Sequence, residues 1–428
     1  MAGLNLPFSL RASVLALAGL LLASCAPAST KTTLDIWAMG REGEVIGQLI
    51  PAFEKENPGI VVRVQQLPFT AAHEKLLTAF AGDALPDMAQ LGNSWVPEFV
   101  ALGALAPLDA RIAATPAIDR TDYFPGVWDS NVFAGALYGV PWYVDTRLLF
   151  YRRDLLKQAG YDHPPRDWTE WRAQMQAIKA LVGPRRYATY FPLNEYEVLV
   201  VLGLNQPQEM LRDGGRYGNF RSPGFKAALA FYTEMTRDKL APIATSTEIA
   251  NVWDEFDRGL FSFYISGPWQ IGEFKRRLPA SRQGIWMTAP VPGPDGPGIS
   301  NAGGSSLVLF KTSDKQAAGW KLIEYLSRPA TQVRFHALTG DLPPRRSAWT
   351  APSLREDRYA RAFADQLLRA KPTPKVPEWE RIATEVRLVA EAAVHGRLTV
   401  DQAATQMDAR ADAILAKRRW MLDQGTAK

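Results

Sequence analysis

Hydrogen-bonding side chains recur beside the turns of this 428-residue chain, in a combination that suits a carbohydrate site. Sugars present hydroxyls at their edges and C–H patches on their faces. A site therefore needs carboxylates, amides or guanidinium groups together with flat aromatic rings. A hydrogen bond to a charged group contributes about 1.5–3 kcal/mol in a dry site. The polar candidates are Arg41, Glu42, Gln66, Asn93, Asp145, Asn194, Glu195 and Arg345.

Aromatic rings are the second requirement, and the chain is rich in them, with 13 Trp and 13 Tyr. Trp269 is the best candidate for stacking on a sugar ring, because Gly267-Pro268 before it predicts a tight turn. Gly303-Gly304 would let backbone N–H groups approach a sugar oxygen closely. The other aromatic candidates are Trp95, Tyr143, Trp253 and Phe256.

Each candidate also has a purely structural interpretation. Asp145 can form a salt bridge with Arg147, and Asn194 with Glu195 can cap a helix. The other structural alternatives are a solvated charge pair for Arg41 and Glu42, an exposed amide for Gln66, a surface charge for Arg345, a β-turn for Gly303-Gly304, and core packing for Asn93, Trp95, Trp253, Phe256 and Trp269.

The first 25 residues have the pattern of a bacterial lipoprotein signal peptide. An apolar run from Val14 to Leu22 follows a short polar stretch and is too short to span a bilayer comfortably. It ends in Leu22-Ala23-Ser24-Cys25, a lipobox in which Cys25 is lipidated and becomes the new N-terminus. Cys25 is the only cysteine, which excludes an intrachain disulfide. We therefore expect a signal peptide over 1–25, a flexible tether over 26–32 and membrane attachment through Cys25; an ordinary signal peptide with a chance cysteine is the alternative.

Strands and helices alternate through the first third of the chain. Residues 34–37 and 60–64 predict strands, and residues 44–56 predict a helix after a turn at 40–43. A helix at 74–80 and a strand at 87–91 follow. This alternation predicts an α/β fold with a mostly parallel sheet covered by helices on both faces. The loops at 38–43, 65–69 and 91–95 then share one rim, outside the carboxyl ends of the strands, where ligands bind in such sheets.

The later segments predict a second lobe and a return to the first. Residues 139–145 predict a crossing between lobes, with helices to follow at 152–159, 168–182 and 223–238. A strand at 306–310 and a helix at 315–328 mark the return, and the last 70 residues are predicted to form helices at 356–370, 377–395 and 399–422. We assign residues 33–142 and 306–352 to the N-terminal lobe, and residues 147–302 and 356–428 to the C-terminal lobe.

Seven motifs in order give the chain a family resemblance over about residues 33–422. They are Leu34-Asp35-Ile36-Trp37, Phe53-Glu54-Lys55-Glu56-Asn57-Pro58, Leu85-Pro86-Asp87, Gly139 to Arg147 with Phe150-Tyr151-Arg152, Pro165 to Trp171, Ser266-Gly267-Pro268-Trp269, and Gly303 to Leu307 with Leu342-Pro343-Pro344-Arg345. The chain resembles the family 1 extracellular solute-binding proteins of ABC importers. Within this family, the chain looks most similar to the maltose- and trehalose-binding branch, on the basis of Ala72 to Leu77, Leu91 to Trp95, Trp142 to Arg147 and Pro192 to Glu195.

The resemblance implies a two-lobe periplasmic-binding-protein-like fold of type II with a hinge between the lobes. It implies a disaccharide ligand such as maltose or trehalose, with Asp145 bound to its hydroxyls, ABC permease subunits as partners, a monomer outside the cytoplasm, and no enzymatic activity. Two other functions stay open. Glu42, Asp145 and Glu195 could supply the paired carboxylates of a glycoside hydrolase, and the solute could be a peptide, a polyol or a glycerol phosphate ester.

The remaining composition argues against other classes of partner. The net charge of +5 is spread along the chain without the basic stripe and interleaved aromatics expected of a nucleic-acid-binding protein. The four histidines at 73, 163, 336 and 395 have no metal-ligand spacing. We expect no metal, no cofactor and no nucleic acid.

Overall fold

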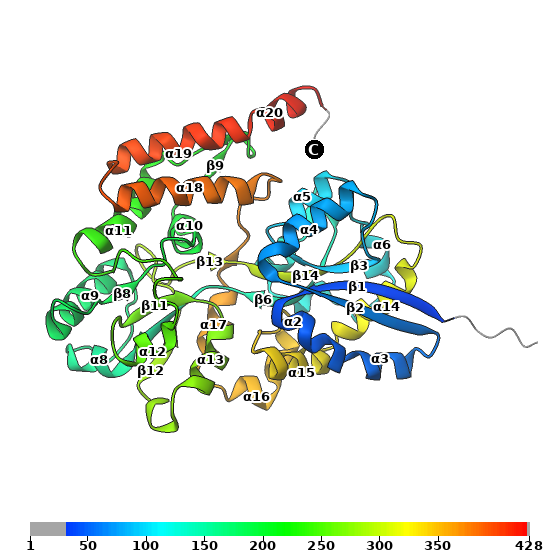
Figure 1. Cartoon of the computed structure of the whole chain (residues 1–428), viewed down its shortest axis with the longest axis horizontal. Helices are drawn as coiled ribbons and strands as arrows, with labels where there is room; N and C mark the ends of the chain where they lie inside the picture. Colours follow the sequence, from blue (N-terminus) through cyan, green and yellow to red (C-terminus); the bar gives the residue numbers. More distant parts are fainter. Residues whose placement is uncertain (1–30, 426–428) are drawn as a thin grey trace, which may run out of the picture.

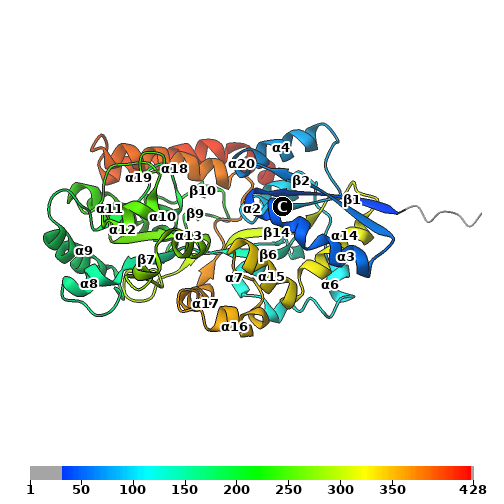
Figure 2. The ribbon, with the colours of Figure 1, turned by 60° about the horizontal axis from the view of Figure 1, so that its bottom comes forward.

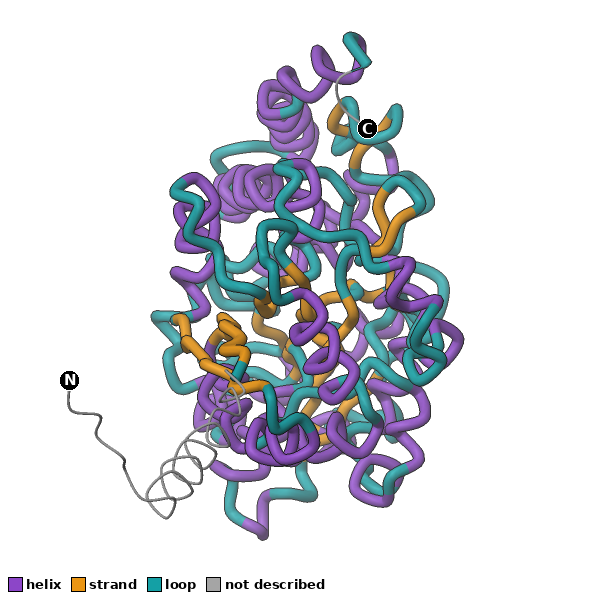
Figure 3. Tube along the Cα trace, turned by 90° about the vertical axis from the view of Figure 1, so that its right-hand side faces the viewer, coloured by secondary structure: helices purple, strands orange, loops and turns teal. Residues whose placement is uncertain are grey.

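The computed structural model describes residues 31–425, so the predicted signal peptide, Cys25 and nearly all of the predicted tether lie outside the described residues. Two sheets lie side by side and divide the described chain into two lobes joined by central strands (Figure 1). Helices and loops make up most of the outside of the molecule, and several strands lie in its middle (Figure 3). Among residues 31–425, no helix is both long and apolar enough to cross a bilayer.

The first lobe contains a five-stranded sheet in the order β2 (Ile60–Leu67), β1 (Thr32–Met39), β3 (Met88–Gly92), β14 (Gly303–Leu309) and β6 (Val140–Asp145). β1 is parallel to both β2 and β3, so their carboxyl ends meet at one edge, as the sequence predicts. β14 is antiparallel to both of its neighbours, which makes the sheet mixed rather than mostly parallel.

The first-lobe helices cover both faces of this sheet. They are α2 (Gly40–Val45), α3 (Ile50–Glu56), α4 (Phe69–Ala81), α5 (Val96–Ala101), α6 (Asp109–Ala113), α7 (Pro125–Asp129), α14 (Gln316–Leu326) and α15 (Pro329–Thr339). Strand β14 contributes to the apolar core on both faces of the sheet. Leu307 and Leu309 pack in one apolar cluster, and Val308 between them packs in another. The turn predicted at 40–43 is the first turn of α2. The helix predicted at 44–56 is interrupted by a 3₁₀ helix at Ile46–Gln48, and α3 begins at Ile50 with Pro51 in its first turn.

The second lobe contains a four-stranded sheet in the order β12 (Trp286–Ala289), β7 (Leu148–Arg152), β11 (Phe263–Ser266) and β8 (Thr189–Tyr190). Only β11 and β8 pair in parallel. Alternate residues of β7 again enter two clusters, Leu149 and Tyr151 on one face and Leu148 and Phe150 on the other. Both lobes are therefore helix–sheet–helix sandwiches, each with a core on both faces of its sheet.

The second-lobe helices are α8 (Arg153–Gln158), α9 (Trp168–Val182), α10 (Glu197–Leu204), α11 (Pro223–Arg237), α12 (Val252–Asp257), α13 (Trp269–Arg277), α16 (Pro352–Arg355), α17 (Arg361–Leu367), α18 (Trp379–Val394), α19 (Val400–Ile414) and α20 (Ala416–Asp423). Of these, α8, α9, α11 and α18 match predicted helices closely. α17 is shorter than the helix predicted at 356–370, and the helix predicted at 399–422 is divided into α19 and α20. α18 and α19 lie on one side of the molecule, and α16 and α17 lie on the opposite side (Figure 2).

Three short two-stranded ladders complete the fold: β4 (Val132–Phe133) with β5 (Ala136–Leu137), β9 (Leu211–Arg212) with β10 (Tyr217–Gly218), and β13 (Ser300–Asn301) with β15 (Ala370–Lys371). The chain crosses between the sheets where β6 leads into β7 and where β13 leads into β14. These crossings place residues 145–147 and 300–304 at the centre of the molecule (Figure 1).

Candidate functional site

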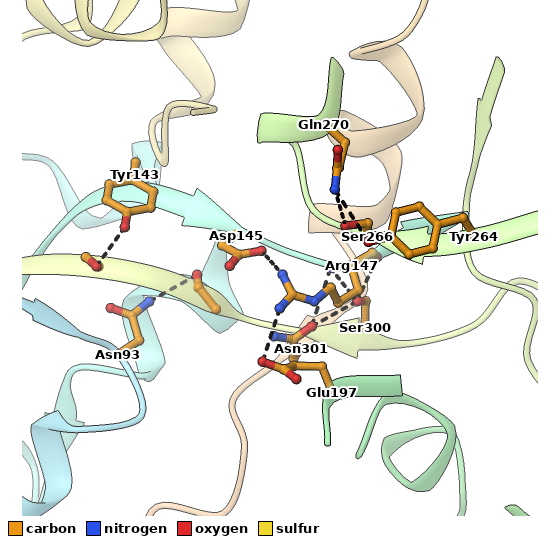
Figure 4. Close-up of polar contacts among 12 residues, drawn as sticks. Asn93, Tyr143, Asp145, Arg147, Glu197, Tyr264, Ser266, Gln270, Ser300 and Asn301 are labelled. Carbon is orange, nitrogen blue, oxygen red and sulfur yellow. Dashed lines mark hydrogen bonds and ion pairs between the residues drawn. The ribbon is translucent and has the colours of Figure 1, made fainter. Parts of the chain in front are cut away.

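Arg147 is the centre of a polar network at the crossing from β6 to β7. Its Nη1 donates to Oδ1 of Asp145 at 2.5 Å, and its Nη2 lies 3.2 Å from Oε1 of Glu197 at the start of α10 (Figure 4). The Arg147 backbone is held as well, because its N–H donates to Oγ of Ser300 at 3.0 Å and its carbonyl accepts from the same hydroxyl at 2.8 Å. The network thus joins the end of one crossing strand, the start of the other and a second-lobe helix.

Trp269 lies directly against this network, because the Arg147 guanidinium carbon is 4.8 Å from the centre of its ring. The ring also folds back over Gly267, where any Cβ would collide with it. Glycine is thus required two residues before Trp269 for a reason that differs from the tight turn expected from the sequence. Trp269 is partly exposed, but it is not among the residues that line the interlobe cavity described below.

Burial sets the electrostatics of the network. It raises the pKa of the Asp145 carboxyl, although the Arg147 charge opposes the shift. Burial and the charge of Glu197 raise the pKa of Glu195 in the same way. For Arg147, burial would lower the pKa, but the carboxylates of Asp145, Glu197 and Glu195 outweigh it and raise the pKa. The single positive charge of Arg147 is therefore surrounded by the negative charges of Asp145, Glu197 and Glu195.

A cavity of about 180 Å³ opens beside this network, between the two lobes. First-lobe residues of its wall come from the β3–α5 turn, α4 and the end of β6, and second-lobe residues come from α10 and the start of α18. The wall includes Phe69, Asn93, Trp95, Asp145, Arg147, Tyr196, Glu197, Asn301, Gly303, Gly304, Lys375, Trp379 and Glu380. Of the residues predicted from the sequence, Asn93, Trp95, Asp145, Gly303 and Gly304 line it.

Asn93 and Trp95 line the cavity, but they are largely engaged in structural contacts. The Asn93 amide donates to the Gly303 carbonyl at 3.2 Å, and its oxygen accepts from the Ser306 hydroxyl at 2.8 Å. The Trp95 ring is buried in the first-lobe core, with its centre 4.9 Å from that of the His73 ring. The packing interpretation describes these two residues better than a direct polar contact with a ligand.

Gly303 and Gly304 serve the backbone rather than a ligand in this arrangement. They pair with Asp145 and Val144 across the β14–β6 ladder, where a Cβ at either glycine would collide with a β6 carbonyl. Gly304 also has a φ of +109°, which side-chain-bearing residues rarely adopt. The two glycines let β14 approach β6 closely at the crossing, which is a structural reason for glycine at both positions besides an approach to a sugar.

A second group of acids lies behind Tyr143. The Tyr143 hydroxyl accepts hydrogen bonds from Gln90 at 3.1 Å and from Ser305 at 3.0 Å. It also contacts Glu42, which shares a hydrogen bond with Asp341. Burial and the charge of Glu42 raise the pKa of Asp341 well above its ordinary value, and burial raises that of Glu42. Glu42 therefore belongs to a buried carboxyl pair close enough to Asp145 to feel its charge.

Arg345 does not line the cavity. Its Nε donates to Asp122 at 2.7 Å, and its Nη1 donates to the carbonyls of Ala117 and Ser327 at 3.0 and 2.9 Å. The residue is only 8% exposed. Arg345 ties first-lobe segments together, which corrects the expectation that it forks onto a ligand.

Two aromatic candidates pack inside the second lobe. Phe256 is fully buried, with its ring centre 5.0 Å from that of Phe274, so it cannot touch a ligand in this conformation. Trp253 donates through Nε1 to Gln270 at 2.7 Å, and its ring lies 3.9 Å from the guanidinium carbon of Arg277. The core alternative describes both residues.

The remaining polar candidates lie at exposed positions outside the cavity wall. Arg41 pairs with Glu44 at 2.9 Å, and Gln66 donates to the Gly40 carbonyl at 3.1 Å. Asn194 is exposed and bonds to Ser246. Glu195, next to it, also lies outside the cavity wall but is partly buried. It is close enough to Arg147 for its charge to raise the pKa of Arg147.

Comparison with known families agrees with this two-lobe arrangement. The model of the bacterial extracellular solute-binding protein family matches residues 39–333. The chain belongs to this family.

Similar proteins add detail to this assignment. The structure of the sugar-binding protein MalE from the phytopathogen Xanthomonas citri superimposes with a TM-score of 0.89 at 56% identity, over 92% of this chain and 100% of that one. An uncharacterized lipoprotein of Streptomyces antibioticus is 28% identical over 85% of this chain and 84% of its own length. The diacetylchitobiose-binding protein DasA of Streptomyces coelicolor is 23% identical over 90% of this chain and 91% of its own length. The two-lobe α/β fold expected from the resemblance is confirmed.

Sequence reasoning missed several charged residues of this solute-binding protein. The sequence indicates Arg147 only as a salt-bridge partner of Asp145, a bond that the structure contains. It does not mark Glu197, Glu380 or Asp341 as members of a site. Glu197 carries a usable signal, since it lies two residues after Glu195 in the same helix-start motif. Nothing in the sequence near Asp341 marks its pairing with Glu42.

Proposed function

We propose that the chain captures an α-linked glucose disaccharide, maltose or trehalose, in the cavity between its lobes and delivers it to an ABC importer. The observation that supports this most strongly is the Asp145–Arg147–Glu197 network beside Trp269. Asp145, Arg147 and Glu197 line one wall of an interlobe cavity, and the flat Trp269 ring packs against the Arg147 guanidinium. These are the groups that hold sugar hydroxyls and cover sugar faces.

The charge of the wall favours a neutral polyhydroxyl ligand over a phosphate ester. Asp145, Glu197 and Glu380 supply carboxylates, whereas Arg147 and Lys375 are the cations among the described lining residues. Arg147 is already shared by two carboxylates, and Lys375 lies 3.1 Å from Asp129. A phosphate would meet more negative than available positive charge, so a polyol remains a better alternative than a glycerol phosphate ester.

The position of the site implies that binding is coupled to lobe closure. Wall residues come from both lobes, and Asp145 and Arg147 lie in the crossing itself. A sugar that contacts both sides binds more tightly when the lobes are close together, so it shifts the population toward the closed state. Closure around the sugar without a chemical step is the expected behaviour of a transport protein.

The cellular setting follows from the leader and the family. Cys25 anchors the mature protein by its lipid to the outer face of the membrane, where permease subunits receive the sugar. A relative named as a lipoprotein supports this placement. Replacing Cys25 with Ala should move the protein from the membrane fraction to the soluble extracytoplasmic fraction, and unchanged fractionation would contradict the anchor.

A thermal-shift screen of disaccharides, polyols and phosphate esters tests the ligand, followed by calorimetry on the best compound. Maltose or trehalose should give the largest shift. Asp145→Ala and Trp269→Ala should each weaken binding at least about tenfold, roughly 1.4 kcal/mol. Unchanged affinity in both variants would refute the site, and glucose released during incubation with a disaccharide would support a hydrolase instead.

A further inference from the structure

The first turn of α18 presents a carboxylate to the cavity that the Arg147 network does not use. Glu380 lines the wall, and its Oε2 accepts a hydrogen bond from the Tyr196 hydroxyl at 3.0 Å. Its Oε1 is buried from solvent and has no hydrogen-bond donor among residues 31–425. Tyr196 also lines the cavity, so the bond orients the Glu380 carboxylate within the wall.

A buried carboxylate oxygen without a donor is unfavourable, and native proteins rarely retain one without a reason. Glu380 lies at the cavity wall, so a side-chain or lobe movement that opens Oε1 to the cavity lets a ligand hydroxyl supply the missing donor. No lysine or arginine is paired with Glu380 among the described ion pairs, in contrast to Asp145 and Glu197. Its charge is therefore available for a hydrogen bond with an incoming ligand.

Phe69 is a first-lobe wall residue of the same cavity and is 53% exposed, unusual for a phenylalanine. It begins α4, and its ring centre lies 5.9 Å from that of Trp95. Trp95 is itself fixed against His73 and against Gly92, where a Cβ would touch the indole. The Phe69 ring therefore has a rigid aromatic support on one side and an accessible face on the other.

The charge of Glu380 reaches the helix that carries Phe69. Burial would lower the pKa of His73 on α4, but the hydrogen bond and charge of Glu98, together with the charge of Glu380, raise it. Glu380 belongs to the second lobe and Phe69 to the first, and both line the same cavity. A ligand there would lie between a carboxylate and an aromatic ring.

We propose that Glu380, oriented by Tyr196, and Phe69 form a second sugar-ring subsite, separate from the ring held at Asp145, Arg147 and Trp269. Glu380 accepts a hydroxyl through Oε1, and Phe69 covers the apolar face of the same ring. This inference rests on the proposed function. It makes these two residues determinants of affinity for a disaccharide.

Calorimetry with the disaccharide that binds the wild type best tests the subsite. Glu380→Gln and Phe69→Ala should each weaken binding at least about tenfold. Matched controls are Glu385→Gln, which changes an α18 carboxylate paired with Arg410 outside the cavity, and Leu102→Ala, which removes another exposed apolar first-lobe side chain. Both controls should stay within about twofold of the wild type.

A second readout separates ligand binding from a structural role. The melting temperature of the sugar-free Glu380→Gln protein should match that of the wild type within about 2 °C, because the variant loses no ion pair, while the shift produced by sugar should shrink. A lower sugar-free melting temperature with affinity within about twofold would show a structural role and overturn the subsite.

The outcome also distinguishes the subsite from the proposed function. If Asp145→Ala loses at least about tenfold in affinity but Glu380→Gln and Phe69→Ala stay within about twofold, the subsite is wrong and sugar binding stands. If the wild type binds no sugar at all, the proposed function fails and the subsite fails with it.

Discussion

Replacing Arg147 with Met tests whether one guanidinium holds the charge balance of the crossing. Its side chain is only 11% exposed, and those of its partners Asp145 and Glu197 are 26% and 27% exposed. Removing one member of a buried ion pair costs about 3–5 kcal/mol, because the remaining charge is left uncompensated. The partial exposure of the two carboxylates reduces this, so we expect Arg147→Met to lower the free energy of unfolding by about 2–3 kcal/mol at neutral pH.

The loss should depend on pH in a defined direction. Without Arg147, the folded-state pKa values of Asp145 and Glu195, already raised by burial, rise further above their unfolded values. The folded variant then binds more protons than the unfolded chain, so its stability increases as the pH falls toward the unfolded carboxyl values. The difference between variant and wild type should therefore narrow between about pH 7.5 and about pH 5.

Urea denaturation of sugar-free protein at these two pH values measures both effects. Arg258→Met is the matched control, because Arg258 is 71% exposed and pairs with Glu255 at the surface; it should cost less than about 0.5 kcal/mol. Adding Asp145→Asn to Arg147→Met should restore part of the lost stability, since it removes one of the unbalanced charges. A loss below about 1 kcal/mol, or a loss that is the same at both pH values, would refute this account of the network.

Three further predictions concern residues outside that network. Asp341 and Glu42 have raised pKa values, so the free energy of unfolding should fall as the pH rises above the ordinary Asp value of 3.8. In urea titrations, Asp341→Asn should flatten this dependence of stability on pH, and an unchanged dependence would contradict the prediction. Arg345→Ala should lower the free energy of unfolding by about 3 kcal/mol and leave sugar affinity within about twofold. A large loss of sugar affinity in calorimetry would show that Arg345 does contact the ligand. Gly304→Ala, at a φ of +109°, should cost about 1–3 kcal/mol in thermal unfolding, and wild-type stability would show that β14 relaxes away from β6.

The fold was predictable where local signals define an element. α9 occupies Trp168–Val182 as predicted, because the Asp167 side chain caps its first turn and Gly183 ends it with a φ of +78°. The shared edge of β1, β2 and β3 also follows from local alternation. The antiparallel pairing of β7 with β11 and β12 was not predictable, because it depends on how segments more than 100 residues apart meet.

The candidate site shows the same division. Asp145 and Trp269 stand beside local turn signals, and the structure brings both to Arg147. The pairing of Glu42 with Asp341 joins residues nearly 300 positions apart, so no pattern near either residue announces it. Sequence reasoning therefore located one wall of the site and missed the acids that come to it from distant helices.

Arg147 and Arg345 show why residue type alone cannot assign a role. Both Arg147 and Arg345 follow turn-rich motifs, and both are nearly buried. The Arg345 donors are taken up by Asp122 and by two backbone carbonyls, groups that form part of the first-lobe scaffold. Arg147 instead holds two carboxylates whose other oxygens remain for hydrogen bonds at a cavity wall. Those carboxylates come from the crossing and from the second lobe. A ligand that hydrogen-bonds to either one therefore also changes the ion pairs of Arg147, which connect the crossing to the second lobe.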